Sequence, residues 1–315
     1  MNNLKKVGLT ALAGALVSFS ANAAELTVTG GASIGFTGEE MVNTGNGWSM
    51  NDGLTFAATT ELDNGMTVTA TQIIDSSDGA AGAIMDTRTL KIDMGDNGVL
   101  TFAGTGGSSV LNAVDDTTPT AYEESWDVVS SASAIPGGTG GDNMFHYSNS
   151  SLMDGVKVSA SYTPSSGGTA SIESSADYGV EYTGIDGLTI GVAQGENNLK
   201  AATVEITNMY AKYAMDAFTI GMTASEADSE TASADKDFTA MGISYAVSEE
   251  LSVSLNTSTI DYEDATLSDQ DSMGVSVSYV MGSMTLKAAR NDVDNIAGTS
   301  TADRSAYDLS LAFAF

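Results

Sequence analysis

The chain has 315 residues, no cysteine and one histidine, and its 41 acidic against 11 basic side chains give a formal net charge of -30. The lack of cysteine excludes disulfides and thiolate-ligated metals, and the acidity argues against nucleic-acid binding, which needs clustered Lys and Arg. Because 42% of the residues are apolar, the sequence is too hydrophobic for a solvated disordered chain, and we expect a folded protein.

Residues 1–23 have the features of a secretory signal peptide. Lys5 and Lys6 precede an apolar run over residues 7–19, and Ala21 and Ala23 form an Ala-x-Ala cleavage site. We therefore expect cleavage after Ala23 and export of residues 24–315 as a single domain. No later stretch approaches the roughly 18 to 20 apolar residues of a membrane-spanning helix. The mature chain is then either soluble outside the cytoplasm or crosses a membrane as strands.

From residue 25 the sequence alternates between apolar and small polar residues, which is the period of a β-strand with two different faces. We predict about sixteen strands, marked by the apolar sets at residues 26–36, 54–58, 66–70, 90–94, 100–102, 144–148, 156–162, 178–182, 188–192, 204–210, 218–222, 241–245, 251–255, 273–279, 284–288 and 307–315. The opposite faces are mostly Thr, Ser, Gly and Ala, as in the wall of a water-filled lumen.

The connections alternate between short turns and longer acidic or Gly/Ser/Thr-rich loops, the residues 195–202 being one of the latter. Short turns at one end and long loops at the other are typical of an outer-membrane barrel. We predict an all-β fold, a transmembrane antiparallel β-barrel. One connection, residues 106–142, is far longer than a compact domain needs and is expected to be functional.

Strand parity assigns side chains to the lumen. Lys91 alternates with Leu90 and Ile92, so it is the expected cation of the lumen wall. By the same alternation the lumen wall should carry a set of acidic residues that attract cations, namely Glu61, Asp93, Glu181, Glu205 and Asp308.

With the signal peptide and the sixteen strands, three further features carry a family resemblance. They are the Gly-Leu-Thr-Phe stretch at residues 53–56, the Gly-Val-Leu-Thr-Phe stretch at residues 98–102 before the long third loop, and the terminal Phe315. The chain resembles the Gram-negative general diffusion porins, more loosely their alphaproteobacterial branch. The Pro-Glu-Phe-Gly-Gly motif common in enterobacterial third loops is absent, and the wall has few arginines.

The resemblance implies that the third loop folds into the barrel and narrows the channel. The carboxylates implied at this constriction are Asp115, Asp116, Glu123, Glu124 and Asp127. It also implies a homotrimer in the outer membrane, in contact with lipid and lipopolysaccharide. The last strand, with Tyr307, Phe313 and Phe315, resembles the signal read by the barrel-assembly machinery.

The expected function is therefore passive diffusion of small hydrophilic solutes and ions through an outer-membrane channel, with cation selectivity. We expect no enzyme and no catalytic residues, because nothing around His146 forms a recognised nucleophile pattern. No cofactor is expected, although acidic pairs such as Glu39-Glu40 could ligate calcium. The alternative is a secreted acidic calcium-binding β-protein, an adhesin or surface-layer module.

Overall fold

The computed structural model describes the backbone of residues 24–40, 45–75, 85–138, 141–165, 173–199, 202–231 and 234–315. The expected signal peptide, residues 1–23, lies outside the described residues. Among those that are described, no helix is both long and apolar enough to cross a membrane.

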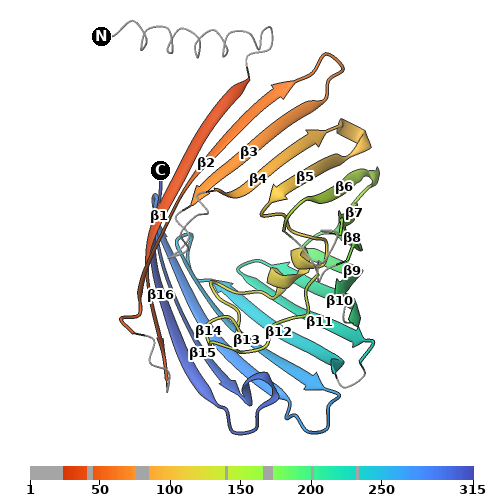
Figure 1. Ribbon diagram of the computed structural model, residues 1–315. Helices are drawn as coiled ribbons and strands as arrows, with labels where there is room; N and C mark the ends of the chain where they lie inside the picture. The colour runs from red at the N-terminus through yellow and green to blue at the C-terminus, as the bar shows by residue number, and fades with distance from the viewer. Residues whose placement is uncertain are drawn as a thin grey trace, which may run out of the picture.

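Sixteen antiparallel strands close into one barrel, in which each strand pairs with its neighbours in sequence and β1 pairs with β16 (Figure 1). This confirms the predicted fold class and strand number. The strands are β1 (Glu25–Glu39), β2 (Trp48–Glu61), β3 (Thr67–Asp75), β4 (Met85–Asp93), β5 (Val99–Thr105), β6 (Met144–Met153), β7 (Val156–Thr163), β8 (Ser175–Ile185), β9 (Leu188–Leu199), β10 (Ala202–Met215), β11 (Phe218–Ser229), β12 (Lys236–Ala246), β13 (Leu251–Tyr262), β14 (Gln270–Met281), β15 (Met284–Asp294) and β16 (Arg304–Ala314). Within the described ranges, 3-10 turns occur at η1 (Gly95–Asn97), η2 (Asn112–Thr117) and η4 (Ile296–Gly298).

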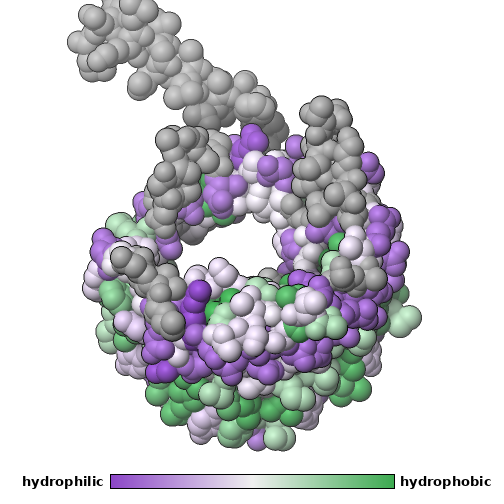
Figure 2. All heavy atoms as spheres, turned by 60° about the horizontal axis from the view of Figure 1, so that its bottom comes forward, coloured by the Kyte–Doolittle hydropathy of each residue, from purple (hydrophilic) through white to green (hydrophobic). Residues whose placement is uncertain are grey.

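The alternation of the sequence becomes the difference between the two faces of the barrel wall. Large apolar side chains such as Met241, Ile243 and Val275 are exposed on the outside. Small polar side chains of the same strands or of adjacent strands, such as Ser254 and Ser276, are buried inside. Figure 2 shows an opening through the ring, with hydrophobic atoms gathered on the outer surface. An apolar outside and a polar inside are what a barrel needs in order to sit in lipid and enclose water.

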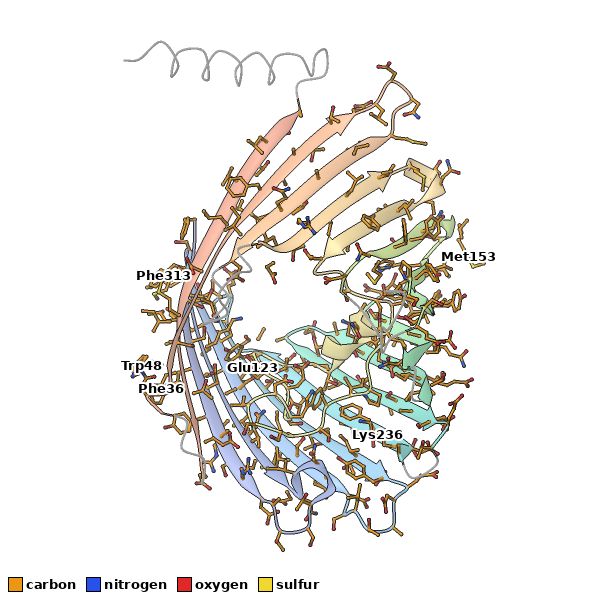
Figure 3. The ribbon with its side chains drawn as sticks, in the orientation of Figure 1. Phe36, Trp48, Glu123, Met153, Lys236 and Phe313 are labelled. Atoms are coloured by element: carbon orange, nitrogen blue, oxygen red, sulfur yellow. The ribbon has the colours of Figure 1, made fainter. Side chains whose placement is uncertain are left out.

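The two ends of the chain close the barrel. The backbone N–H of Gly30 donates to the carbonyl of Phe315 at 2.8 Å, and the N–H of Phe315 donates back at 2.9 Å. Farther along the same seam, the ring of Phe36 stacks on Tyr307 and meets the edge of Trp48. Figure 3 shows Phe36 and Trp48 side by side on the outside of the barrel, with Phe313 farther along the same seam.

One predicted long loop is instead part of a hairpin. Residues 195–202 were expected to form a connection, but β9 and β10 pair as far as Leu199 opposite Ala202. The polar composition of these residues therefore does not mean a lack of strand structure. Tertiary pairing outweighs the low intrinsic strand propensity of Gly, Asn and Glu.

Candidate functional site

The segment between β5 and β6, here called the β5–β6 loop (residues 106–143), crosses the inside of the ring and contacts the wall on one side (Figure 1). Thr117 and Thr118 lie within hydrogen-bond distance of Thr223 Oγ1 on β11, at 3.0 and 3.1 Å. Farther along, the backbone N–H groups of Ala121 and Tyr122 donate to serine hydroxyls of β13 and β14. Hydroxyls that would line an open lumen are therefore satisfied by the loop on this side.

Glycines in the wall allow the loop to lie against the strands. A Cβ atom on Gly242 would stand 2.5 Å from the carbonyl oxygen of Pro119, and one on Gly221 would stand 2.8 Å from the Pro119 ring. Likewise, a Cβ on Gly274 would stand 2.8 Å from Cα of Ser125. Cross-strand pairing puts Gly221 beside Gly242, so the loop follows neighbouring positions of the wall.

Apolar side chains of the loop pack against apolar side chains on the inner face of the wall. Trp126 and Ile135 pack with Phe238, Ala240 and Ile260 of the wall, and the Trp126 ring meets the Phe238 ring edge to face. Two similar clusters form around Leu111 of the loop with β9 to β11, and around Val129 with β15 and β16. The hydrophobic core of the described structure thus lies inside the barrel, between the loop and half of the wall.

At the middle of the loop, polar groups of the loop meet polar groups from three strands. Tyr122 Oη donates to Asp308 Oδ1 on β16 at 2.7 Å, and Thr37 Oγ1 on β1 donates to the other carboxylate oxygen at 2.6 Å. Lys287 Nζ on β15 lies 4.9 Å from the centre of the Tyr122 ring, in a cation–π contact. Glu123 lies next to this group, inside the ring in Figure 3.

Burial raises the pKa of the Glu123 carboxyl above its usual range, although its hydrogen bond with Tyr122 and the nearby Lys287 oppose the shift. Burial, and then the hydrogen bond to Asp308, raise the pKa of Tyr122, which therefore stays a neutral donor. The cluster combines carboxylates with one ammonium group on the same side of the lumen.

The carboxylates implied for the constriction fall into different environments. Glu123 is half-buried and Asp127 is exposed, whereas Glu124 is only 3% exposed. Asp127 Oδ2 accepts a hydrogen bond from the backbone N–H of Glu124. The side chains of Asp115 and Asp116, in η2, lie outside the described residues. Of the five, Glu123 and Asp127 are the accessible ones that the structure describes.

The predicted wall residue Lys91 lies on the lumen face. It pairs with Thr101, which pairs with His146, which in turn pairs with Ser161, so all four are on the same face of the sheet. That face is the inner one, because Ser161 Oγ accepts a hydrogen bond from the backbone N–H of Val110 in the loop. Asp93 shares the face of Lys91, and Glu61 joins it through the β2–β3–β4 pairing. Glu181 is also on the lumen face, where its carboxylate accepts a hydrogen bond from the buried Tyr210 hydroxyl.

Glu205 is on the other face, so this part of the prediction was wrong. On β10, Ile206 and Tyr210 are buried beneath the loop, while Met209 and Tyr213 are exposed on the face that Glu205 shares. The sequence pattern assumed that apolar residues face outward. It reverses here because the lumen side of β10 packs against Leu111 and Val114 of the loop.

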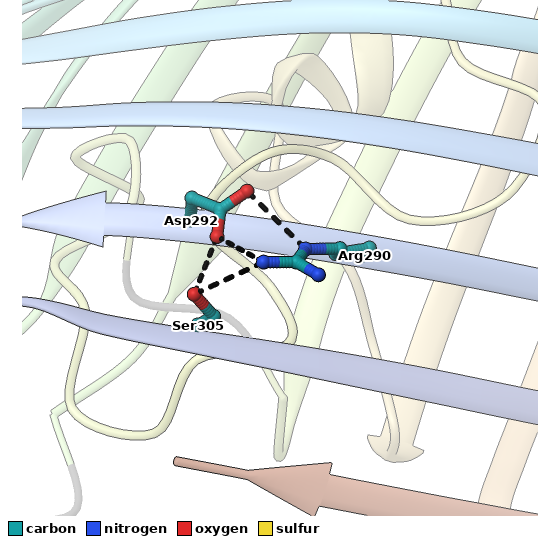
Figure 4. A network of polar contacts seen from close by, with 3 residues as sticks. All are labelled: Arg290, Asp292 and Ser305. Atoms are coloured by element: carbon teal, nitrogen blue, oxygen red, sulfur yellow. Dashed lines mark hydrogen bonds and ion pairs between the residues drawn. The ribbon is translucent and has the colours of Figure 1, made fainter.

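An ion pair at the seam holds the far part of the loop. Arg304 Nη1 on β16 lies 3.1 Å from Glu39 Oε1 on β1, and the Glu39 side chain is only 3% exposed. The backbone N–H of Ser130 in the loop donates to the other Glu39 oxygen. By contrast, Arg290 pairs with Asp292 and reaches Ser305 on the outer face, where its side chain is 60% exposed (Figure 4).

Sequence reasoning did not single out Lys287 or Tyr122, which meet at the centre of the cluster. The parity of Lys287 between Leu286 and Ala288 could have placed it in the lumen, but nothing in the sequence pairs it with the loop. Within the described ranges, no three acidic or histidine side chains group closely enough to hold a metal ion, and calcium binding stays a prediction.

Comparison with known proteins decides the family. The sequence model of Gram-negative porins matches residues 8–266. The chain belongs to this porin family. It is an outer-membrane protein that forms a channel, and neither the family nor the closed barrel favours the secreted calcium-binding alternative. No curated protein matches the sequence of this porin.

Solved structures share the fold. A mutant porin of Rhodopseudomonas blastica is 14% identical, with a TM-score of 0.67 over 92% of this chain and 100% of the other. An anion-selective porin from Comamonas acidovorans is 11% identical, with a TM-score of 0.70 over 93% and 100%. OmpT of Vibrio cholerae, solved as a trimer, is 13% identical, with a TM-score of 0.68 over 93% and 99%.

Proposed function

We propose that this porin passes small hydrophilic solutes and ions by passive diffusion, and that residues 106–142 narrow its channel and make it cation-selective. The observation that carries the proposal is the placement of Glu123 on the loop, close enough to Asp127 and Asp308 to interact electrostatically with both. Three carboxylates on one side of a water-filled passage lower the energy of a passing cation.

The charges on strands β1 to β5, the part of the wall across the lumen from the loop, support this proposal. Among the described residues of β1 to β5, Arg88 and Lys91 are the only cations. Arg88 is exposed and lies on the same outward face of β4 as Leu90, which leaves Lys91 as the one cation of this part of the lumen wall. The lumen face there is mainly hydroxyl-bearing, as where Thr59 Oγ1 and Thr69 Oγ1 lie 3.0 Å apart. A wall with one ammonium group repels cations little, so the loop-side acids dominate the field.

The proposal extends to partners. Residues 24–315 form the single exported domain once residues 1–23 are removed, and the barrel works as a homotrimer, a state in which OmpT of Vibrio cholerae was solved. The outer apolar face meets outer-membrane lipid and lipopolysaccharide. The terminal strand, with Tyr307, Phe313 and Phe315, is read by the barrel-assembly machinery. Its support is the exposure of all three rings on the outside.

Planar-bilayer recording of the purified protein tests the function directly. Stepwise conductance and a reversal potential of cationic sign in a KCl gradient are expected, and Glu123→Gln should lower the cation preference. The matched control is Glu205→Gln, which removes the same charge from the outer face. Anion selectivity of the unmodified channel would overturn the electrostatic part of the proposal, and a folded protein without conductance would overturn all of it.

A further inference from the structure

We infer that the start of the β5–β6 loop and the lumen face of β7 to β10 form a binding site for small zwitterionic amino acids. Lys157, Glu181 and Tyr210 supply its polar groups, and Val110 and Val114 of the loop cover the cavity beside them. The site rests on the proposed function, since its ligand arrives through the open channel. It names one class of solute that the lumen holds, and it does not depend on cation selectivity.

Strand register puts the polar groups of the site in one row across four strands. Lys157 of β7 pairs with Glu181 of β8, and Glu181 pairs with Gly191 of β9. Tyr210 of β10 is the partner of Gly191 on its other side, and its ring lies over this glycine while its hydroxyl donates to Glu181 Oε2. Lys157 and Glu181 are therefore opposite charges on the lumen face, with Cβ atoms about 5 Å apart.

The ammonium of Lys157 and the carboxylate of Glu181 are not joined to each other. Neither of the two ion pairs in the described part of the chain contains them. Tyr210 occupies Glu181 Oε2, which leaves Oε1 for a second donor. An α-amino acid carries an ammonium and a carboxylate on one carbon, so it can donate to Glu181 and accept from Lys157 at once. A simple cation or anion satisfies only one of the two groups.

Ser159 adds a neutral donor on the same side of the site as Lys157. It stands two residues from Lys157 on β7, shares the lumen face with it and lines the same cavity. Its cross-strand partner Gly179 is the residue on which Val110 of the loop lies, since a Cβ there would stand 2.6 Å from Val110 Cγ1. The Ser159 hydroxyl is thus placed to donate to the carboxylate that Lys157 attracts.

The size of the cavity limits the side chain of the ligand. Its volume is about 70 Å³, and its apolar lining includes Val110 and Val114 of the loop and Ala193 of the wall, all of them buried. Since one water-sized group needs about 10–15 Å³ of such space, the cavity takes about five non-hydrogen atoms. The isopropyl group of valine fits, whereas the benzyl group of phenylalanine is too large.

The test is ligand-observed saturation-transfer NMR on the folded protein in deuterated detergent, with L-valine as the probe. Two analogues each lack one charge, isovalerate the ammonium and L-valinamide the carboxylate. Each should bind about tenfold more weakly than L-valine, and so should L-phenylalanine. Conductance is measured separately. No saturable binding of L-valine to a conducting protein, or equal binding of all four compounds, would overturn the site while leaving passive diffusion intact.

Substitutions matched to the analogues assign each charge. Lys157→Gln should weaken L-valine about tenfold and leave L-valinamide unchanged, because that analogue has no carboxylate for the lysine to hold. Glu181→Gln, in which the amide oxygen still accepts from Tyr210, should weaken L-valine as much and leave isovalerate unchanged. A weakening of every compound by either change would mean a structural effect and would overturn the assignment.

Two control variants remove the same charges outside the cavity. Lys212→Gln acts at the next lumen position of β10 after Tyr210, and Glu205→Gln acts on the outer face of the same strand. Both should keep the affinity for L-valine within about twofold. If Lys212→Gln weakens L-valine and Lys157→Gln does not, the carboxylate is held elsewhere on the wall and the proposed site is disproved.

Discussion

The hydroxyl of Tyr122 in the β5–β6 loop donates a 2.7 Å hydrogen bond to Asp308 of β16, and so ties the middle of the loop to the strand that closes the barrel. The same carboxylate accepts from Thr37 of β1, the strand on the other side of the seam. One charged acceptor therefore joins the loop, the first strand and the last strand.

This bond should be stronger than a neutral one. Tyr122→Phe, Asp308→Ala and their combination should give a coupling free energy of about 1–2 kcal/mol in urea unfolding, because the acceptor is charged and partly buried. The control cycle uses Tyr262→Phe with Ser133→Ala, which share a neutral 2.9 Å bond between wall and loop. Its coupling should be about half as large. Equal couplings would show that the charge of Asp308 adds nothing.

The ion pair between Glu39 and Arg304 should contribute more to stability than the one between Arg290 and Asp292. Arg304→Gln leaves the Glu39 carboxylate, 3% exposed, without its cation and should cost about 2 kcal/mol. Arg290→Gln breaks a pair whose side chains are 60% and 40% exposed and should cost under about 1 kcal/mol.

The readout for both variants is acrylamide quenching of Trp126, made the single tryptophan by Trp48→Phe. Because Trp126 is buried against Phe238, its quenching reports release of the loop from the wall. Quenching should rise for Arg304→Gln and stay unchanged for Arg290→Gln. Unchanged quenching in both would show that the seam does not hold the loop.

Gly242 should tolerate no side chain. Gly242→Ala would place a Cβ 2.5 Å from the backbone oxygen of Pro119, so the loop must move off the wall into the passage, at about 1–3 kcal/mol. Single-channel conductance should fall. Gly53→Ala is the matched control on the uncovered wall, where the nearest atom is 3.7 Å away, and conductance should not change. A fall in both variants would point to the strands and not to the loop.

Much of this architecture was predictable because alternation is imposed by the strand itself. The closed barrel, the strand number and the lumen side of Lys91 all follow from period two. The failures occur where the loop packs. Ile206, Phe238 and Ile260 are apolar on the lumen side of their strands, which breaks the alternation at the ends near the long loops.

Those breaks carry information that a strand count misses. Exposing the large apolar side chain of Phe238 or Ile260 to water in the lumen would be unfavourable, so a second apolar surface must cover it. The only long segment able to do so in the sequence is the third loop, yet the pairing of Trp126 with Phe238 cannot be read from spacing. The contact between Tyr122 and Asp308 is equally hidden, since 186 positions separate them.

The raised pKa of Glu123 predicts a pH dependence of selectivity. Burial favours the neutral carboxyl, so this group takes up its proton at a higher pH than an ordinary glutamate as the solution is acidified. The cation preference should therefore begin to fall at a higher pH than it would if Glu123 titrated as an ordinary glutamate. Reversal potentials recorded over a pH series, at fixed salt, measure this directly.

In Glu123→Gln the early part of that fall should disappear, while Asp127→Asn should leave it in place. An early fall that persists in Glu123→Gln would assign the titration to another group of the lumen.

The contribution of Glu123 to folding stability changes with pH in the opposite direction to that of a salt-bridged acid. A carboxyl whose pKa is raised in the folded protein binds its proton more tightly there than in the unfolded chain, so this group favours folding at low pH and loses that contribution as the pH rises.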